Sequence, residues 1–251
     1  MNEVVACLAT IPSRKKELKL VCESLLPQVD RLFVYFNNYK ESEVPLWAKS
    51  IDKVEYETSF DGEYGDLGDV GKFYFCSEEM KDKYGITGLV FTCDDDIVYP
   101  EWYVSRTVGY LERSAGKRVV FSYHGSTLPR RCTDYHPQKK VLPCKGTVRR
   151  LTQVHVAGTG CMAFDLGLFC PSLDMFEYTN MSDIYVANWA KQINVSLYVL
   201  PHEIGDFQVL NVKETIWSST SKRDKSEKDR SRQTNSVVSG LTWEPLSRPQ
   251  L

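Results

Sequence analysis

The sequence lacks several features that would place a protein in a class at once. None of its 8 cysteines stands in a Cys-x-x-Cys pair, so we expect neither a zinc site nor a disulfide framework, and a reducing cytoplasm is favoured. No apolar run approaches the length of a membrane span. Residues 1–5 have no basic segment before their apolar run, as a secretory signal would. A net charge of −2 predicts no general attraction to nucleic acid or to anionic membranes.

What the sequence does contain is enough apolar material for a packed core. The chain has 251 residues, of which 42% are hydrophobic and 25% are charged, values typical of one large soluble domain. From residue 214 onward it becomes polar, and 222–235 has too little apolar content to fold alone. We therefore predict a folded domain over 1–213 and a tail over 214–251 that is partly flexible or folds over the active site.

Apolar runs alternate with amphipathic segments along the folded part. Helices are predicted from residue 13 to about 25, around 73–80, and at 101–113 and 181–193. The segment 129–150 is predicted to be irregular. Strands are predicted at 4–10, 32–36, 53–58, 89–93, 118–123, 151–156 and 195–200. This alternation predicts an α/β fold in which helices flank a mostly parallel central sheet.

Three adjacent carboxylates, Asp94, Asp95 and Asp96, follow the apolar run at 89–93 and are called the triplet below. They repel one another, and a hard divalent cation with oxygen ligands is a compensator that also carries phosphates. The C-terminal edge of a buried strand is where open α/β sheets bind ligands. The triplet thus points to a metal-assisted enzyme acting on a phosphorylated substrate. The alternative is a solvated turn whose last aspartate caps the helix near Pro100.

Other polar residues are candidates for the same site. Asp183 lies three and seven residues before Val186 and Ala190, so it faces inward with that apolar stripe, although the helix dipole alone also favours an acid there. His202 follows a strand and is either a third ligand for a manganese-like ion or a surface histidine. His155 is interpreted as structural.

The segment 129–150 is strongly basic, with seven Lys/Arg and one acid. It is either a solvated loop or a surface for a diphosphate or an anionic acceptor, with nucleic acid as one such acceptor.

Two phosphate-binding motifs are only approximated. Gly71-Lys72 resembles the end of a P-loop, but position 66 is Asp and Phe73 stands where a Ser or Thr would bind magnesium. The run 158–163 fits the dinucleotide fingerprint, yet the helix that it must open is interrupted by Gly167 and Pro171. Neither motif is taken as a nucleotide site.

Taken together, five segments of the chain resemble bacterial and phage glycosyltransferases of the GT-A type, close to glycosyltransferase family 2. The resemblance runs from Val4 to about Phe207. Two departures are visible: Ser182-Asp183 replaces a common Glu-Asp pair, and the Gln-x-x-Arg-Trp motif of processive members is missing. The segments that carry the resemblance are 8–14 (LATIPSR), 68–74 (GDVGKFY), 94–100 (DDDIVYP), 155–160 (HVAGTG) and 180–183 (NMSD).

The resemblance implies a nucleotide-sugar donor, with a UDP-sugar preferred, and a Mn²⁺ or Mg²⁺ cofactor. It also implies a donor-binding half at 1–100 and an acceptor and catalytic half at 101–213. Asp183 matches the catalytic base, Asp96 would bind the metal, Asp94 would lie near the ribose, and the turn Gly158-Thr159-Gly160 would bind the acceptor. We predict Asp94 and His202 as the further metal ligands beside Asp96. The donor-binding residues implied are Thr10, Pro12, Arg14, Asp69, Lys72, Asp94 and Asp95.

The expected activity is therefore a single-sugar transfer to an acceptor hydroxyl by a hexosyl- or pentosyltransferase, with inversion. The acceptor would be a glycan or, for a phage enzyme in its host's cytoplasm, modified DNA bound by 129–150. Two alternatives remain open. One is a nucleotidyltransferase, although the loop after the first strand has no glycine. The other is a non-catalytic module that binds a nucleotide sugar or carbohydrate.

Overall fold

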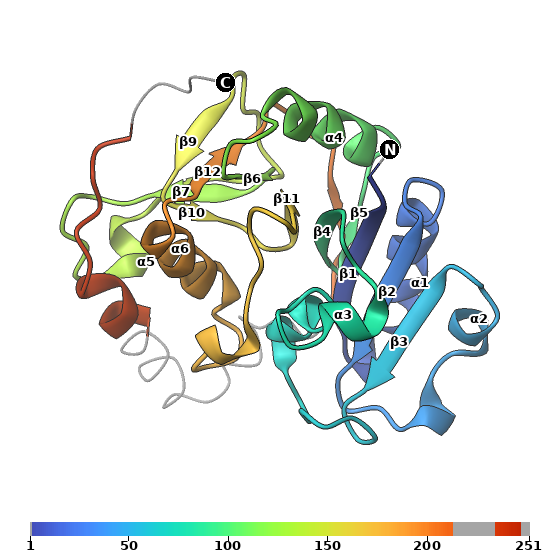
Figure 1. Ribbon diagram of the computed structural model, residues 1–251. Coiled ribbons are helices and arrows are strands. Elements are labelled where there is room, and N and C mark those ends of the chain that lie inside the picture. Colours follow the sequence, from blue (N-terminus) through green and yellow to red (C-terminus); the bar gives the residue numbers. More distant parts are fainter. Residues whose placement is uncertain (1, 213–233, 247–251) are drawn as a thin grey trace.

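The predicted α/β class is confirmed by an eight-stranded central sheet with helices on both faces (Figure 1). The computed structural model describes residues 2–212 and 234–246. Six strands run in one direction, while β11 and β9 run in the other. In sheet order the strands are β3 (Val54–Thr58), β2 (Arg31–Phe36), β1 (Val4–Thr10), β4 (Leu89–Asp94), β11 (Cys161–Asp165), β6 (Val119–Ser122), β12 (Ser196–Val199) and β9 (Thr152–Val154).

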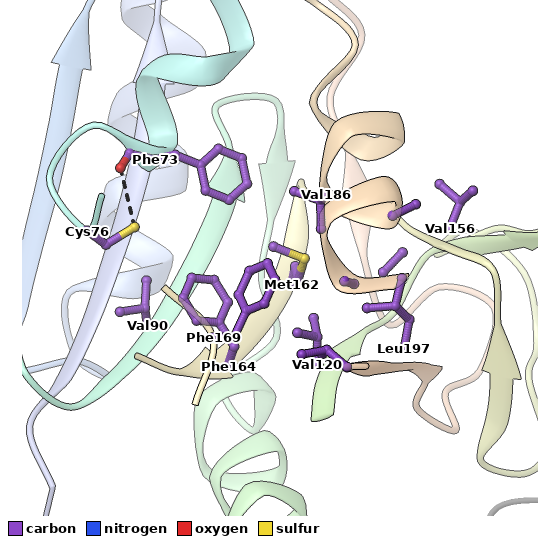
Figure 2. Packing of buried hydrophobic residues seen from close by; sticks show 14 of the residues in the cluster. Phe73, Cys76, Val90, Val120, Val156, Met162, Phe164, Phe169, Val186 and Leu197 are labelled. Carbon is purple, nitrogen blue, oxygen red and sulfur yellow. Dashed lines mark hydrogen bonds between the residues drawn. The ribbon is translucent and has the colours of Figure 1, made fainter. Parts of the chain in front are cut away.

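Side-chain alternation along the strands creates two separate cores. In β1, Ala6 and Leu8 face helices α1 (Lys15–Leu25) and α4 (Tyr103–Arg113) on one face of the sheet. Val5 and Cys7 face the opposite core, which contains helix α6 (Ser182–Gln192) and the 3₁₀ helix η3 (Gly68–Phe73). Figure 2 shows part of this second core, where Phe73 and Val186 lie close to the strand side chains Met162 and Phe164. The sheet is thus covered on both faces, as parallel sheets require.

Shorter elements complete the fold around the main sheet. A three-stranded sheet consists of β10 (Val156–Ala157), β7 (Gly125–Thr127) and β8 (Lys140–Leu142), and β13 (Gln208–Val209) pairs with β5 (Ile97–Val98). No helix in the described residues is both long and apolar enough to cross a bilayer. The short helices are η1 (Pro12–Arg14), η2 (Glu41–Glu43), α2 (Leu46–Lys49), α3 (Lys81–Tyr84), α5 (Tyr135–Gln138) and η4 (Leu173–Met175).

Most predicted elements are present, with four differences. The helix predicted around 73–80 is wrong: residues 70–77 are all buried, so their apolar spacing reflects a segment enclosed on every side rather than one helical face. The predicted strand 151–156 is interrupted at His155. The segment 129–150 contains α5 and β8, so it is not irregular throughout. Finally, β11 was not predicted, although it occupies the middle of the sheet.

Part of the predicted tail is packed onto the domain. Residues 214–233 and 247–251 lie outside the described residues, whereas 234–246 contact the elements near α5 (Figure 1). Trp243 is 3% exposed and its ring lies 5.5 Å from that of His155. Thr242 forms a β-bridge with Arg131, and the Asn235 side chain accepts a hydrogen bond of 2.9 Å from the Tyr135 amide. This segment therefore fixes the position of α5.

Candidate active site

A cavity of about 580 Å³ opens where the parallel strands β1, β2 and β4 end. The strands are parallel and in register, with Ala9 opposite Asp94 and Thr10 opposite Phe36, so the residues that follow them meet at one edge. Two walls enclose the cavity. The triplet wall contains Thr10, Arg14, Lys72, Asp94, Asp95 and Asp96, and the α6 wall contains Tyr135, Lys139, Thr159, Asp183 and Thr234.

Basic side chains donate hydrogen bonds to two of the triplet carboxylates. Lys72 donates to the Asp94 carboxylate, and Arg14 donates to the Asp95 carboxylate. Burial opposes the charge on Lys72, but Asp94 and Asp69 together outweigh this effect and raise its pKa. Asp95 lines the cavity but is only 3% exposed, and its carboxylate is paired with Arg14. Asp95 is therefore the member of the triplet that the protein encloses most fully, which favours a structural role for it.

Asp96 is the least compensated member of the triplet. Its Oδ2 lies 3.5 Å from Arg14, and its side chain is 20% exposed toward the cavity. Burial, followed by the charges of Asp94 and Asp95, raises the pKa of Asp96 to about 7. Among the described residues, the cavity lining contains six aspartates (66, 69, 94, 95, 96 and 183) against Arg14, Lys72 and Lys139. This excess of acid favours a cationic ligand.

The donor set is compatible with Mg²⁺ or Mn²⁺ held partly by a substrate. Within 2–212 and 234–246, no group of three or more His, Cys, Asp or Glu side chains is arranged to hold a metal ion. Asp94 and Asp96 do line the same cavity with hard oxygen atoms. Magnesium is commonly bound by one or two carboxylates together with substrate phosphates. These two residues fit that arrangement, and an all-protein metal cage is not present among the described residues.

His202, the third predicted ligand, is not brought to this cavity. It is 3% exposed, and its Nδ1 and Nε2 lie 2.8 Å from the Leu200 carbonyl and 3.2 Å from the Pro143 carbonyl. Its ring packs against Tyr123 and Phe207. Both nitrogens are thus engaged with backbone oxygens, so the metal role predicted for His202 is corrected to a structural one.

Asp183 is fixed at the first turn of α6 by the turn at Thr159. Its Oδ1 accepts hydrogen bonds from the Thr159 amide at 2.8 Å and from the Thr159 hydroxyl at 2.7 Å. No hydrogen bond to Oδ2 is formed by the described residues, and this residue lines the cavity. One carboxylate oxygen is therefore tethered while the other remains available to a ligand.

Asp69 also holds the start of helix α6 in place. It accepts hydrogen bonds from the backbone amides of Asn180 and Ser182 and from the Ser182 hydroxyl, so a side chain from η3 satisfies amides at the start of α6. Burial raises the pKa of Asp69, against the attraction of Lys72. The Ser182 hydroxyl also lies 2.9 Å from the Thr159 hydroxyl. Asp69 thus positions α6 and lines the cavity as well.

The two glycines beside Thr159 have a different role from the predicted one. A Cβ at Gly160 would overlap the Asp94 carboxylate, and a Cβ at Gly158 would lie 2.8 Å from His124 Cβ. Only Thr159 of this turn lines the cavity. The glycines therefore make room for protein side chains, and the acceptor contact predicted for Gly158 and Gly160 is replaced by this packing role.

Several other predicted and unpredicted residues can now be placed. Thr10, Arg14, Asp69, Lys72 and the triplet line the cavity with Asp183, whereas Pro12 does not. Sequence reasoning missed Asn37, whose position directly after β2 was a usable signal. It also missed Thr234, which lies in a segment without periodicity. Of the basic residues in 129–150, only Lys139 lines the cavity.

Comparisons with known proteins identify no family for this chain. No family model matches, and no curated protein sequence matches. Among solved structures, the mannose-1-phosphate geranyltransferase from Thermus thermophilus aligns with a TM-score of 0.41 and 11% identity. The alignment covers 77% of this chain and 65% of that one, so this chain spans less than two thirds of its length. At this identity no site residue is transferable between them.

Proposed function

We propose that this protein is a metal-dependent glycosyltransferase that moves one sugar from a nucleoside-diphosphate sugar to an acceptor hydroxyl. One observation carries the proposal. Four of the segments singled out from the sequence, those around Thr10, Lys72, the triplet and Asp183, line one cavity at the C-terminal edge of a mostly parallel sheet. A uridine diphosphate donor and Mn²⁺ or Mg²⁺ are the proposed ligands.

The triplet wall would bind the donor. Thr10 and Asn37 lie at the ends of β1 and β2, where a nucleoside enters an open sheet. Arg14 and Lys72 would bind the diphosphate, and Asp96 with Asp94 would hold the metal ion. When bound, that ion neutralises negative charge on the departing diphosphate. Lys72 then has two possible anionic partners, its present one in Asp94 and the diphosphate.

The α6 wall would supply the base. The acceptor oxygen forms a bond to the anomeric carbon as the bond from that carbon to the diphosphate oxygen breaks, and the electron pair leaves on the diphosphate. Asp183 Oδ2 takes the hydroxyl proton, while Thr159 holds Oδ1 in place. Attack from the face opposite the leaving group inverts the anomeric centre. The tethered Oδ1 and available Oδ2 support this assignment.

The test is a panel of nucleotide sugars with Mn²⁺, followed by release of nucleoside diphosphate. We expect turnover of one donor class, its loss in excess chelator, and its loss in Asp96→Ala. Asp183→Asn should retain donor binding and lose transfer. Asp52→Asn, which changes an exposed aspartate outside the cavity, is the matched control.

The same panel separates the alternatives. Formation of pyrophosphate from a nucleoside triphosphate and a sugar 1-phosphate, without donor hydrolysis, would replace the proposal with a nucleotidyltransferase. Calorimetric binding of a nucleotide sugar with neither activity would identify a non-catalytic module. Full activity of the Asp96→Ala variant, or full activity of the wild type in excess chelator, would refute the metal role. Loss of donor binding in Asp183→Asn would make Asp183 a structural residue.

A further inference from the structure

Lys139 is a cation built into the α6 wall of the cavity. It follows the last residue of α5, is partly buried, and lines the cavity together with Asp183. Its Nζ lies 4.4 Å from the centroid of the Tyr135 ring, so an aromatic face covers one side of the ammonium group. Across the described ranges 2–212 and 234–246, no carboxylate lies within 4.0 Å of this nitrogen.

The charge of Lys139 is less compensated than that of the other basic residues in the cavity. Arg14 and Lys72 each form an ion pair with the triplet. For Lys139, burial lowers the pKa of the ammonium group, and the more distant charge of Asp183 opposes this without reversing it. A partly buried cation without a close anion is stabilised by an anionic ligand. Because Lys139 and the proposed base Asp183 line the same cavity, an anion bound to Lys139 would lie beside that base.

The rest of the basic segment indicates the size of this anion. Its other six Lys/Arg are exposed and lie outside the cavity, so they do not extend the charge of Lys139 along the wall. A polyanion such as DNA would be bound mainly by those exposed residues, whereas Lys139 matches one anionic group inside the cavity. These six residues are Arg130, Arg131, Lys140, Lys145, Arg149 and Arg150.

We infer that the acceptor is a sugar or polyol that carries a single phosphate or carboxylate close to its reacting hydroxyl, and that Lys139 binds this group. The inference rests on the proposed function, because Asp183 must act on an acceptor held at the same wall. The anion would lie in the cavity against the Lys139 ammonium group, whose other side is covered by the Tyr135 ring. The hydroxyl of the same molecule would then face Asp183.

The experiment uses small anions as probes of this site. Methyl phosphate and acetate are titrated calorimetrically into the wild-type protein, Lys139→Met and Lys140→Met, with the donor site saturated by UDP and Mn²⁺. Lys140 is the matched control because it is the adjacent, exposed lysine outside the cavity. We expect at least one probe to bind to the wild type and to Lys140→Met. Binding to Lys139→Met should be weaker by about tenfold or more, the factor for losing one charge-assisted hydrogen bond.

The preferred probe distinguishes a phosphorylated acceptor from a carboxylated one. Equal binding of the probes to Lys139→Met and the wild type, or no binding of either probe, would overturn the inference. So would an oligonucleotide that binds tightly and loses affinity in Lys140→Met but not in Lys139→Met. Thermal unfolding of each variant checks that it is folded.

Failure of this inference is distinguishable from failure of the proposed function. Donor hydrolysis with Mn²⁺ does not need the acceptor, so hydrolysis by the wild type tests the proposed function whether or not Lys139 binds an anion. If no nucleotide sugar is hydrolysed by the wild type, the proposed function fails. The titrations, repeated without UDP, then still report whether Lys139 binds an anion.

Discussion

Replacing Asp96 with asparagine should stabilise the metal-free protein at alkaline pH. The pKa of Asp96 is raised from 3.8 to about 7, chiefly by burial and then by its two acidic neighbours. Below the pKa of the unfolded state, the carboxyl is neutral in both the folded and the unfolded protein, so it does not lower the free energy of unfolding. As the pH rises toward the folded pKa, the unfolded state ionises first and is favoured. Stability is therefore lost between about pH 4 and pH 7.

The magnitude follows from the size of the shift. Each pKa unit corresponds to about 1.4 kcal/mol, so three units give a penalty on the order of 4 kcal/mol above pH 7. Asparagine removes the charge at nearly constant shape but also loses the weak attraction to Arg14 at 3.5 Å. We expect the free energy of unfolding to rise by roughly 2 kcal/mol or more at pH 8 and to change little at pH 4.

The assay is urea denaturation of wild type and Asp96→Asn in chelator at pH 4, 6 and 8. Asp52→Asn is the control, because this exposed aspartate lies outside the cavity. A second arm adds Mn²⁺ at pH 8, which should stabilise the wild type and not Asp96→Asn. The reasoning is refuted if Asp96→Asn is destabilised at pH 8 in chelator, or if its effect is the same at all three pH values.

Two further predictions concern the α6 wall and the C-terminal segment. Thr159→Val removes the hydroxyl that donates to Asp183 Oδ1 and should lower kcat about tenfold, with the donor KM within about twofold; an unchanged kcat would mean that the Thr159 amide suffices. Trp243→Ala empties a buried site beside His155 and should cost about 3 to 5 kcal/mol of unfolding free energy. Urea denaturation measures this loss against Leu46→Ala, a change at an 80% exposed side chain. A loss for Trp243→Ala no larger than the control's would show that the segment is not part of the core.

The sheet was predictable where buried strands are continuous apolar runs. The strands at 4–10 and 89–93 match β1 and β4 almost residue for residue, because both are covered on their two faces. The strand β11 was missed because it follows a glycine turn that resembles another motif. Its antiparallel insertion between β4 and β6 depends on long-range pairing that no local pattern encodes.

The candidate site was predictable to the same extent and for the same reason. Residues directly after parallel strands, such as Thr10 and the triplet, converge by topology alone. The wrong assignments, at Gly158, Gly160 and His202, concern residues whose surroundings come from distant segments. The absence of a side chain at Gly160 predicts room for a ligand, but the Asp94 carboxylate occupies that space.

The position of residues 234–246 has a consequence for the order in which the molecule is made. The triplet wall is encoded in the first hundred residues, whereas Thr234 lines the opposite wall and Asn235 and Trp243 hold the elements around it. During translation these three residues leave the ribosome after every strand of the sheet. The sheet can pair and fold on the nascent chain, but the cavity is completed only once this segment has emerged and docked.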